Sequence, residues 1–239
     1  MVMVTIEQPK AGKGFTYLDT VQGSPEWIAK RYGKVTASRL ADWLAESKPS
    51  KKDGSTYWLK RRKDYELELA YEKQFKVAYQ RYITPAMQAG LDYEDKFADA
   101  YSSHMGVPVE KCGTFYNDKF AASPDRLVGD DGLLEIKVLG DSSFADVLIN
   151  GVPAEYNLQI QGQLLATGRQ WCDFVAGNLN TGRFKVIRVE PDKELITKIV
   201  DSLHDLDNIV TEFDTDNLYE FTMSDDEIKN TIREEVLWT

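Results

Sequence analysis

The sequence predicts an α/β (α+β) fold in which a central mixed β-sheet is flanked by helices. The first indication is residues 122–139, where the turn Gly129-Asp-Asp-Gly132 joins a strand end to an apolar return strand. The second is a pair of segments with alternating polarity, 171–176 and 184–189, which predict two strands on either side of a turn ending at Gly182. Long stretches of helical periodicity lie around these strands, so helices are expected to cover the sheet.

The N-terminal part is expected to begin as a weakly patterned surface arm, residues 1–23, and then to become helical. Ser24-Pro25-Glu26 combines an N-cap, a proline at the first helical position and an acidic first turn. A second helix start follows at Thr36-Ala-Ser38. Residues 45–57 have the composition of a polar, mobile loop, and a helix is expected at about residues 58–75.

Thr84-Pro85 opens the longest predicted helix, which Gly106 ends. Its apolar positions predict a buried stripe, and one carboxylate, Glu94, falls inside it. A buried carboxylate is costly unless it is paired or bound to a metal, so Glu94 is a candidate functional residue. A buried arginine partner, or a position at the edge of the stripe, is the alternative. The stripe consists of Met87, Leu91, Phe97, Ala98, Tyr101 and Met105.

Residues 142–168 predict a helix that is broken near residues 151–153. Gln159 and Gln163 lie four residues apart near its buried face, either as satisfied core amides or as substrate contacts. Pro191 is expected to begin a long helix.

The charge is unevenly distributed. Residues 190–239 hold fifteen acidic and four basic side chains, a balance of −11, whereas the other 189 residues hold 24 acidic and 25 basic ones. We therefore expect one domain over residues 1–239, with a motif-bearing core at 24–190 and an acidic helical extension at 191–239. That extension contains the capping box Ser224-Asp-Asp-Glu227, and it is expected on the outer surface, as a docking element or as a solubilising tail.

Composition excludes several classes of protein. No run of eighteen apolar residues and no basic-then-apolar N-terminus is present, which predicts a soluble, unexported chain. Cys112 and Cys172 have no metal-type spacing and are expected as buried thiols in a reducing compartment. Two isolated histidines do not indicate zinc.

The hairpin carries the first candidate site. Side chains alternate along the return strand, so Glu135 and Lys137 share one face, and Asp125 lies across the hairpin from them. Two carboxylates and an ammonium suit a divalent cation with a water beside it. A plain solvated strand face is the alternative, and in both cases the three side chains are expected to face solvent.

Two other groups suit phosphate. Arg31 beside Ser38, at a predicted helix start, forms either an anion pocket or an ordinary helical corner. A basic window has the composition of a DNA-binding surface or of a solvated loop. Its candidate DNA-binding residues are Lys51, Lys52, Lys60, Arg61 and Arg62.

In their order along the chain, a helical glutamate, a Pro-Asp…Glu-x-Lys hairpin and a downstream glutamine resemble the PD-(D/E)xK nuclease superfamily. More narrowly, the chain resembles the phage lambda exonuclease and YqaJ-like viral recombinase family. The matching pieces are Trp27 with Arg31-Tyr-Gly-Lys-Val-Thr-Ala-Ser38, Gly90-Leu-Asp-Tyr-Glu94, Ser123-Pro-Asp125, Leu134-Glu-Ile-Lys137 and Gln159-Ile-Gln161.

The resemblance implies a role for each matched residue. Asp125, Glu135 and the carbonyl of Ile136 would bind Mg²⁺, with two ions expected and Mn²⁺ as a substitute. Lys137 would orient and help to deprotonate the attacking water, and Glu94 would complete the acidic site. The catalytic set also includes Gln159. Residues implied around the 5′-terminal phosphate are Arg31, Thr36, Ser38, Ser123 and Gln159.

The resemblance also implies an activity and partners. Such an enzyme digests one strand of linear duplex DNA in the 5′→3′ direction and leaves 3′ single-stranded overhangs. It acts as a homotrimeric ring beside a single-strand annealing protein, and it is a phage- or prophage-type protein in the cytoplasm of a bacterial host.

Two other classes remain open. A structure-specific or restriction-type endonuclease would use the same core without a terminal phosphate pocket, so the Arg31 and Ser38 pairing argues against it. A non-catalytic DNA-binding assembly module is disfavoured because the acidic and basic core residues are all present. Two cysteines are too few for an iron–sulfur relative.

Overall fold

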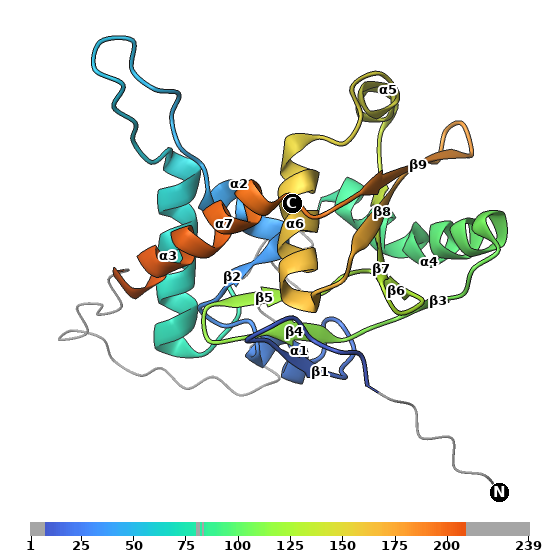
Figure 1. Ribbon diagram of the computed structural model, residues 1–239, viewed down its shortest axis with the longest axis horizontal. Coiled ribbons are helices and arrows are strands. Elements are labelled where there is room, and N and C mark those ends of the chain that lie inside the picture. Colours follow the sequence, from blue (N-terminus) through green and yellow to red (C-terminus); the bar gives the residue numbers. More distant parts are fainter. Residues whose placement is uncertain (1–7, 80–81, 83, 209–239) are drawn as a thin grey trace, which may run out of the picture.

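The structure is a computed structural model that describes residues 8–79, 82 and 84–208. Its larger sheet has five strands in the order β3-β6-β7-β8-β9 (Figure 1). The β7–β8 pair is parallel and the other pairs are antiparallel, so the predicted mixed sheet is confirmed. The strands are β3 (Val109–Glu110), β6 (Arg126–Val128), β7 (Gly132–Val138), β8 (Trp171–Asn178) and β9 (Arg183–Val189).

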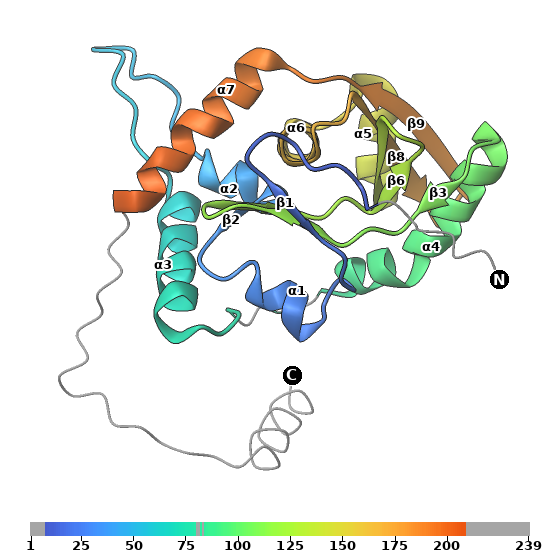
Figure 2. The same ribbon diagram turned by 60° about the horizontal axis from the view of Figure 1, so that its bottom comes forward.

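Strand β7 alternates as the sequence predicts. Leu134 and Ile136 pack in the cluster formed with helix α4 (Pro85–Met105), whereas Leu133 belongs to the cluster formed with α6 (Ala154–Thr167). The two helices therefore cover opposite faces of the sheet (Figure 1, Figure 2). The connection from β7 to the parallel β8 runs through α5 (Asp141–Asn150) and α6, with the predicted break between them.

A second, four-stranded sheet, in the order β1-β4-β5-β2, is absent from the sequence prediction. Its strands are β1 (Thr16–Leu18), β4 (Thr114–Tyr116), β5 (Phe120–Ala122) and β2 (Val35–Thr36). The weakly patterned segment expected as a surface arm up to residue 23 therefore contains a strand, β1, that the sequence did not predict. Strands of two or three residues are too short to show an alternating pattern, and pairing over long sequence distances forms this sheet.

Helix α6 packs between the two sheets (Figure 2). A Cβ on Gly162 would come within 2.6 Å of Leu40 and 2.9 Å of Phe120, so the close approach requires a glycine. This packing brings the glutamines of α6 beside β7 on one side and, on the other, beside the corner between β2 and α2 (Leu40–Trp43).

Most predicted helices are present, but those nearest the two ends of the described chain are shorter than predicted. Ser24 caps α1 by accepting a hydrogen bond from the N–H of Trp27. The helix expected from Pro191 is α7, which ends at Ser202 and continues as the 3-10 helix η2. The rest of that predicted helix and the capping box at Ser224 lie outside the described residues. The remaining bounds are α1 (Pro25–Ala29), η1 (Ala37–Arg39), α2 (Leu40–Trp43), α3 (Lys60–Phe75), α7 (Lys193–Ser202) and η2 (Leu203–Asn208).

The predicted stripe of α4 is only half correct. Phe97, Ala98 and Tyr101 are buried, but Leu91 is 64% exposed. Met87 and Met105, at the two ends of the helix, are also exposed. The reason is length, because a 21-residue helix is about 31 Å long and it packs mainly on β7, with smaller contacts to β3 and β8.

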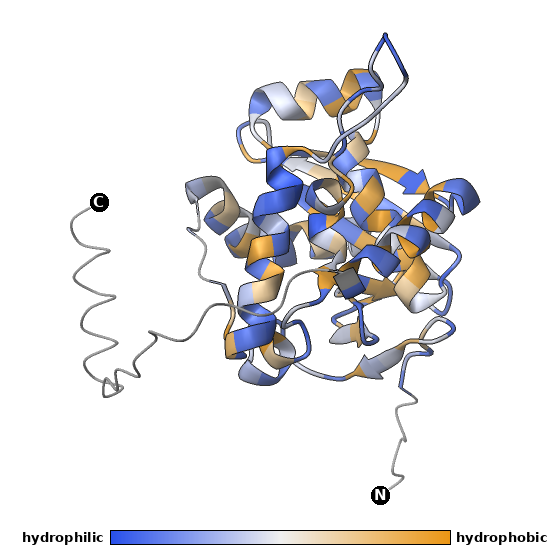
Figure 3. Ribbon diagram, turned by 90° about the vertical axis from the view of Figure 1, so that its left-hand side faces the viewer, coloured by the Kyte–Doolittle hydropathy of each residue, from blue (hydrophilic) through white to orange (hydrophobic). Residues whose placement is uncertain are grey.

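Residues 45–57 project beside α3 as a long loop whose tip is hydrophilic (Figure 3). Its base is closed by a bridge between Glu46 and Trp58. Among the described helices, none combines the length and the apolar character that crossing a bilayer requires. Cys112 and Cys172 are buried free thiols, as predicted.

Candidate active site

Asp125 lies in the short link between β5 and β6, where the chain passes from the small sheet to the large one. Its Oδ2 accepts a hydrogen bond of 2.6 Å from the backbone N–H of Ile136 on β7. This contact joins the two arms of the hairpin and brings Asp125 beside Ile136 of β7, next to Glu135, as the sequence predicts. Because a strand residue directs its N–H and C=O to the same side, the carbonyl of Ile136 faces the same gap.

Glu135 is fully buried, which corrects the expectation that it faces solvent. Three donors hold its carboxylate. Lys137 Nζ lies 2.5 Å and Gln159 Nε2 2.6 Å from Oε1, and Gln163 Nε2 lies 2.6 Å from Oε2. Helix α6 thus covers the face of β7 that the sequence alone could not show to be covered.

The charges of this cluster perturb one another. Burial raises the pKa of Asp125 well above its ordinary value, and the nearby charges of Glu135 and Glu94 raise it further. Burial lowers the pKa of Lys137, but the carboxylates of Glu135 and Asp125 outweigh burial and hold that pKa above its usual range. The cluster therefore holds more negative charge than Lys137 alone neutralises, which favours a bound cation.

Glu94 has the partner that the alternative reading expected. Arg126, which is 4% exposed, donates to Glu94 Oε1 at 2.7 Å and also to Asp95 and the carbonyl of Asp125. Glu94 nevertheless lines the same cavity of about 500 Å³ as Asp125. It is placed at the edge of the acidic site and is held there by an arginine.

The residues present fit a hard divalent cation. Two carboxylates, Asp125 and Glu135, and the carbonyl of Ile136 supply oxygen ligands, and Mg²⁺ typically uses one or two carboxylates with several waters. Within the described part of the chain, no cluster of three or more His, Cys, Asp or Glu side chains has a metal-binding arrangement. The buried Oε1 of Gln163 has no hydrogen-bond partner among the described residues, so it remains available to a water or ligand in the same cluster.

A second cavity, of about 160 Å³, joins Asp125 to the residues implied around a terminal phosphate. Ser123 accepts a hydrogen bond of 2.9 Å from the indole of Trp27, and the guanidinium of Arg31 lies 4.0 Å from the centre of the Trp27 ring. Burial lowers the pKa of Arg31 to about 10. Among the described residues, no carboxylate forms an ion pair with Arg31. The other residues that line this cavity are Gln22, Ala37, Ser38, Gln159 and Gln163.

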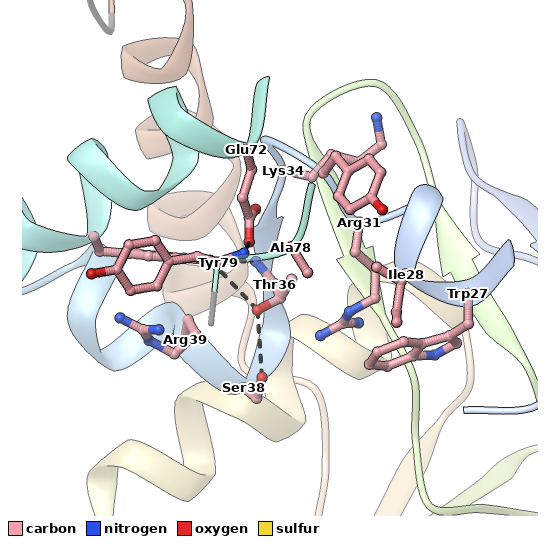
Figure 4. A pocket seen from close by; sticks show the side chains of 12 residues that line it. Trp27, Ile28, Arg31, Lys34, Thr36, Ser38, Arg39, Glu72, Ala78 and Tyr79 are labelled. Atoms are coloured by element: carbon pink, nitrogen blue, oxygen red, sulfur yellow. Dashed lines mark hydrogen bonds between the residues drawn. The ribbon is translucent and has the colours of Figure 1, made fainter. Parts of the chain in front are cut away.

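Thr36 lies next to this cavity and not in its wall. Its hydroxyl is within 3.4 Å of the Ser38 hydroxyl, and its N–H donates to Tyr65 (Figure 4). Thr36 is 8% exposed and lines a neighbouring cavity on the α3 side. The structure therefore gathers all the implied phosphate residues except Thr36 into one cavity.

The basic window separates into two parts. Lys51, Lys52, Lys60 and Arg61 are exposed, on the projecting loop or at the start of α3. Arg62 is 1% exposed, so its prediction as a DNA contact is wrong. Its guanidinium lies between the rings of Trp43 and Trp58 and pairs with Glu66 and Asp205, because the α3 face that bears Arg62 packs on the core.

Two residues of the site carry no clear sequence signal. Gln163 lies on α6 one turn after Gln159, and the sequence left it undecided between core and substrate. Arg126 follows Asp125 directly, and its role became visible only when α4 and β6 were brought together.

Asp125, the Glu135-Ile136-Lys137 strand and the covering glutamines of α6, arranged around a mixed sheet, define a PD-(D/E)xK nuclease core. Residues 26–170, well over half of the chain, match the model of the YqaJ-like viral recombinase domain. The chain therefore belongs to the YqaJ-like viral recombinase family. A search of curated proteins gives no significant match.

Solved structures support this assignment. An alkaline exonuclease from Laribacter hongkongensis, LHK-Exo, is 30% identical with a TM-score of 0.67, covering 90% of this chain and 100% of that one. LHK-Exo is also known in complex with dAMP, at 29% identity with the same coverage and TM-score. A phage-related exonuclease from Haemophilus somnus 129PT shares the fold at 17% identity, with a TM-score of 0.57 over 74% of this chain and 92% of that one.

Proposed function

We propose that this protein is a Mg²⁺-dependent exonuclease that digests one strand of linear duplex DNA in the 5′→3′ direction, leaving 3′ single-stranded overhangs for strand annealing. The observation that carries the proposal is the cavity that joins Asp125 to Arg31. It combines a catalytic carboxylate with a cation that has no ion-pair partner among the described residues. The relationship to LHK-Exo, an alkaline exonuclease, supports the exonuclease part of the proposal.

The substrate end binds through Arg31. A partly buried guanidinium that makes no ion-pair contact among the described residues is costly, and a phosphate dianion would relieve that cost by charge-assisted hydrogen bonds. Ser38, Ser123 and Gln159 add polar atoms to the same cavity. Because the cavity accepts a terminal group, it favours an exonuclease over an endonuclease.

The chemical step is the hydrolysis of the phosphodiester bond beside Asp125. Asp125, Glu135 and the Ile136 carbonyl would hold Mg²⁺, with two ions proposed and Mn²⁺ as a substitute, and the bound metal would supply positive charge at the reacting phosphate. Lys137 would orient the attacking water and favour the loss of its proton through the positive charge of the ammonium group. Gln159 and Gln163 hold the Glu135 carboxylate in place, and Glu94, fixed by Arg126, completes the acidic side of the site.

The proposed DNA contacts, oligomer and partner are taken from the family resemblance. Lys51, Lys52, Lys60 and Arg61 would contact the phosphates of the duplex, whose binding weakens as salt rises. A homotrimeric ring around the DNA and a single-strand annealing protein as partner are part of the proposal. The acidic segment after residue 190 would face away from the DNA.

The test compares linear duplexes that carry a 5′-phosphate or a 5′-hydroxyl with a covalently closed circle, each with Mg²⁺ or with EDTA. We expect rapid Mg²⁺-dependent digestion of 5′-phosphorylated ends, slower digestion of 5′-hydroxyl ends and no cutting of the circle. Cutting of the circle at a similar rate would show an endonuclease. Arg31→Ala is expected to lower kcat/KM on 5′-phosphorylated ends by about thirtyfold or more and to abolish the preference, because a desolvated charge contact is lost. Arg183→Ala, an exposed arginine at the start of β9, is the matched control.

A further inference from the structure

The cavity at Arg31 is not the end of the groove. The cavity of about 500 Å³ beside Glu94 shares Asp125 and Gln22 with the cavity of about 160 Å³. The latter shares Trp27, Arg31 and Ser38 with a third cavity, of about 230 Å³, which opens toward α3. Three cavities therefore follow one another, with Asp125 at the first boundary and Arg31 at the second. Space larger than the phosphate cavity lies beyond Arg31.

Aromatic and hydroxyl side chains line this third cavity (Figure 4). Trp27, half-buried, comes from α1 and the exposed Tyr79 from the segment after α3, whereas Tyr65 of α3 is 2% exposed and only borders the cavity. The guanidinium of Arg39 lies 4.2 Å from the centre of the Tyr65 ring. Aromatic rings beside a cationic groove are the usual means by which proteins hold unpaired bases, since every base has a π-face to stack.

The charges of the third cavity do not suit further phosphates. Glu72 stands in its wall and accepts hydrogen bonds from the N–H groups of Gly33, at 3.2 Å, and Tyr79, at 3.1 Å. Arg39 is paired with Asp42 and Glu68, and Lys34 donates to the carbonyl of Asp118. Lys34 keeps its charge, since among the described residues it bonds only a backbone carbonyl, but Glu72 in the wall and the pairing of Arg39 with two carboxylates reduce the positive charge of this cavity. Together with the aromatic surface, this favours a neutral nucleoside over a second phosphate.

We propose that the third cavity is a subsite for one unpaired nucleoside on the 5′ side of the phosphate bound at Arg31. The proposal rests on the proposed exonuclease activity and extends it to ends that lack a 5′-phosphate. At a 5′-hydroxyl end, the first internal phosphodiester occupies the Arg31 position and the terminal nucleoside enters the third cavity. The bond beside Asp125 is then the second phosphodiester of the strand.

The first product therefore differs between the two kinds of end. Water attacks the phosphorus, the P–O3′ bond breaks, and the 3′ oxygen leaves with a proton. A 5′-phosphorylated end releases a mononucleotide, whereas a 5′-hydroxyl end releases a dinucleoside monophosphate. In both cases the shortened strand carries a 5′-phosphate, so all later products are mononucleotides. The preference for 5′-phosphate remains, because the hydroxyl end must open one more base pair.

The experiment identifies the first product by mass spectrometry from duplexes with a 5′-phosphate, a 5′-hydroxyl, a 5′-triphosphate, or a 5′-hydroxyl on a one-nucleotide overhang. We expect a dinucleoside monophosphate from both hydroxyl ends, with the overhang faster because its extra nucleotide is already unpaired. A single nucleoside as the first product of hydroxyl ends would overturn the subsite. A failure of the proposed activity is distinguishable, because the 5′-phosphorylated duplex would then not be digested.

A filling substitution tests the location of the subsite. Ala78 lines the third cavity, whereas its neighbour Val77 is exposed and does not. Ala78→Phe is expected to lower the rate on hydroxyl ends by about tenfold, the effect of losing one base–aromatic stack, and to leave phosphorylated ends unchanged. Val77→Phe, the matched control, should change neither rate. Equal rates for Ala78→Phe and Val77→Phe would overturn the location, and a selective loss on triphosphate ends would show that the cavity takes phosphates instead of a nucleoside.

Discussion

Lys137→Ala tests the electrostatics of the cluster in the absence of metal. Glu135 is fully buried, and Lys137 is the cation that contacts it, at 2.5 Å. Removing one partner of a buried ion pair costs about 3–5 kcal/mol. The Lys137 side chain is 26% exposed, and the amides of Gln159 and Gln163 remain on the carboxylate, so we expect about 2–3 kcal/mol here.

The assay is urea unfolding followed by tryptophan fluorescence, in EDTA and in Mg²⁺. In EDTA the variant should lose those 2–3 kcal/mol, equivalent to a fall in Tm of about 4–12 °C for a chain of this size. In Mg²⁺ the difference should shrink, because without the Lys137 ammonium on Glu135 the ion should bind the variant more tightly than the wild type. An ion at 100 times its Kd adds about 2.7 kcal/mol to the folded state. Digestion should remain abolished in Mg²⁺, because the water has lost its orienting group.

The double variant Glu135→Gln with Lys137→Ala is the control for charge. It removes the buried anion together with its partner, so it should be more stable in EDTA than Lys137→Ala alone and should respond less to Mg²⁺. If Lys137→Ala unfolds in EDTA at the same urea concentration as the wild type, then Lys137 does not compensate Glu135. If Mg²⁺ leaves the difference unchanged, the ion does not bind at this carboxylate.

Three further substitutions test the surroundings. Arg62→Met should lower the free energy of unfolding by about 3 kcal/mol without changing the salt dependence of DNA binding. Arg61→Met should leave the free energy of unfolding unchanged and reduce the slope of log K against log salt by about one. The reverse pattern would restore Arg62 as a DNA contact. Gly177→Ala should cost about 1–3 kcal/mol in urea unfolding, because its Cβ would meet the Phe97 ring at 2.4 Å, and an unchanged midpoint would show that the ring moves freely. Burial raises the pKa of Glu72, and this effect outweighs the accepted N–H hydrogen bonds, which lower that pKa. The ionised form of Glu72 is therefore disfavoured in the folded state. Glu72→Gln should therefore gain stability relative to the wild type as pH rises above about 4.3, and a difference independent of pH would contradict that sign.

Local patterns in the sequence were sufficient for the hairpin, the long helices and the acidic core. The Gly129–Gly132 turn, the alternation along β7 and the Thr84-Pro85 start depend on neighbours within a few residues, so each can be read without the rest of the fold. The family motifs likewise lie in short segments. Asp125, Glu135, Lys137 and Gln159 were placed together on that basis.

The tertiary structure decided burial and partners. It alone showed that α6 covers Glu135, that Arg126 holds Glu94, and that Arg62 lies between two tryptophans. The small sheet pairs Val35 with Phe120, a contact between segments far apart in the chain that no local pattern encodes. The same long-range packing of α1, α3 and the β2 corner creates the cavity beyond Arg31. Sequence determined which side chains the protein has available for phosphate chemistry, and packing decided which of them meet, because burial and ion pairing depend on the residues that folding brings from elsewhere.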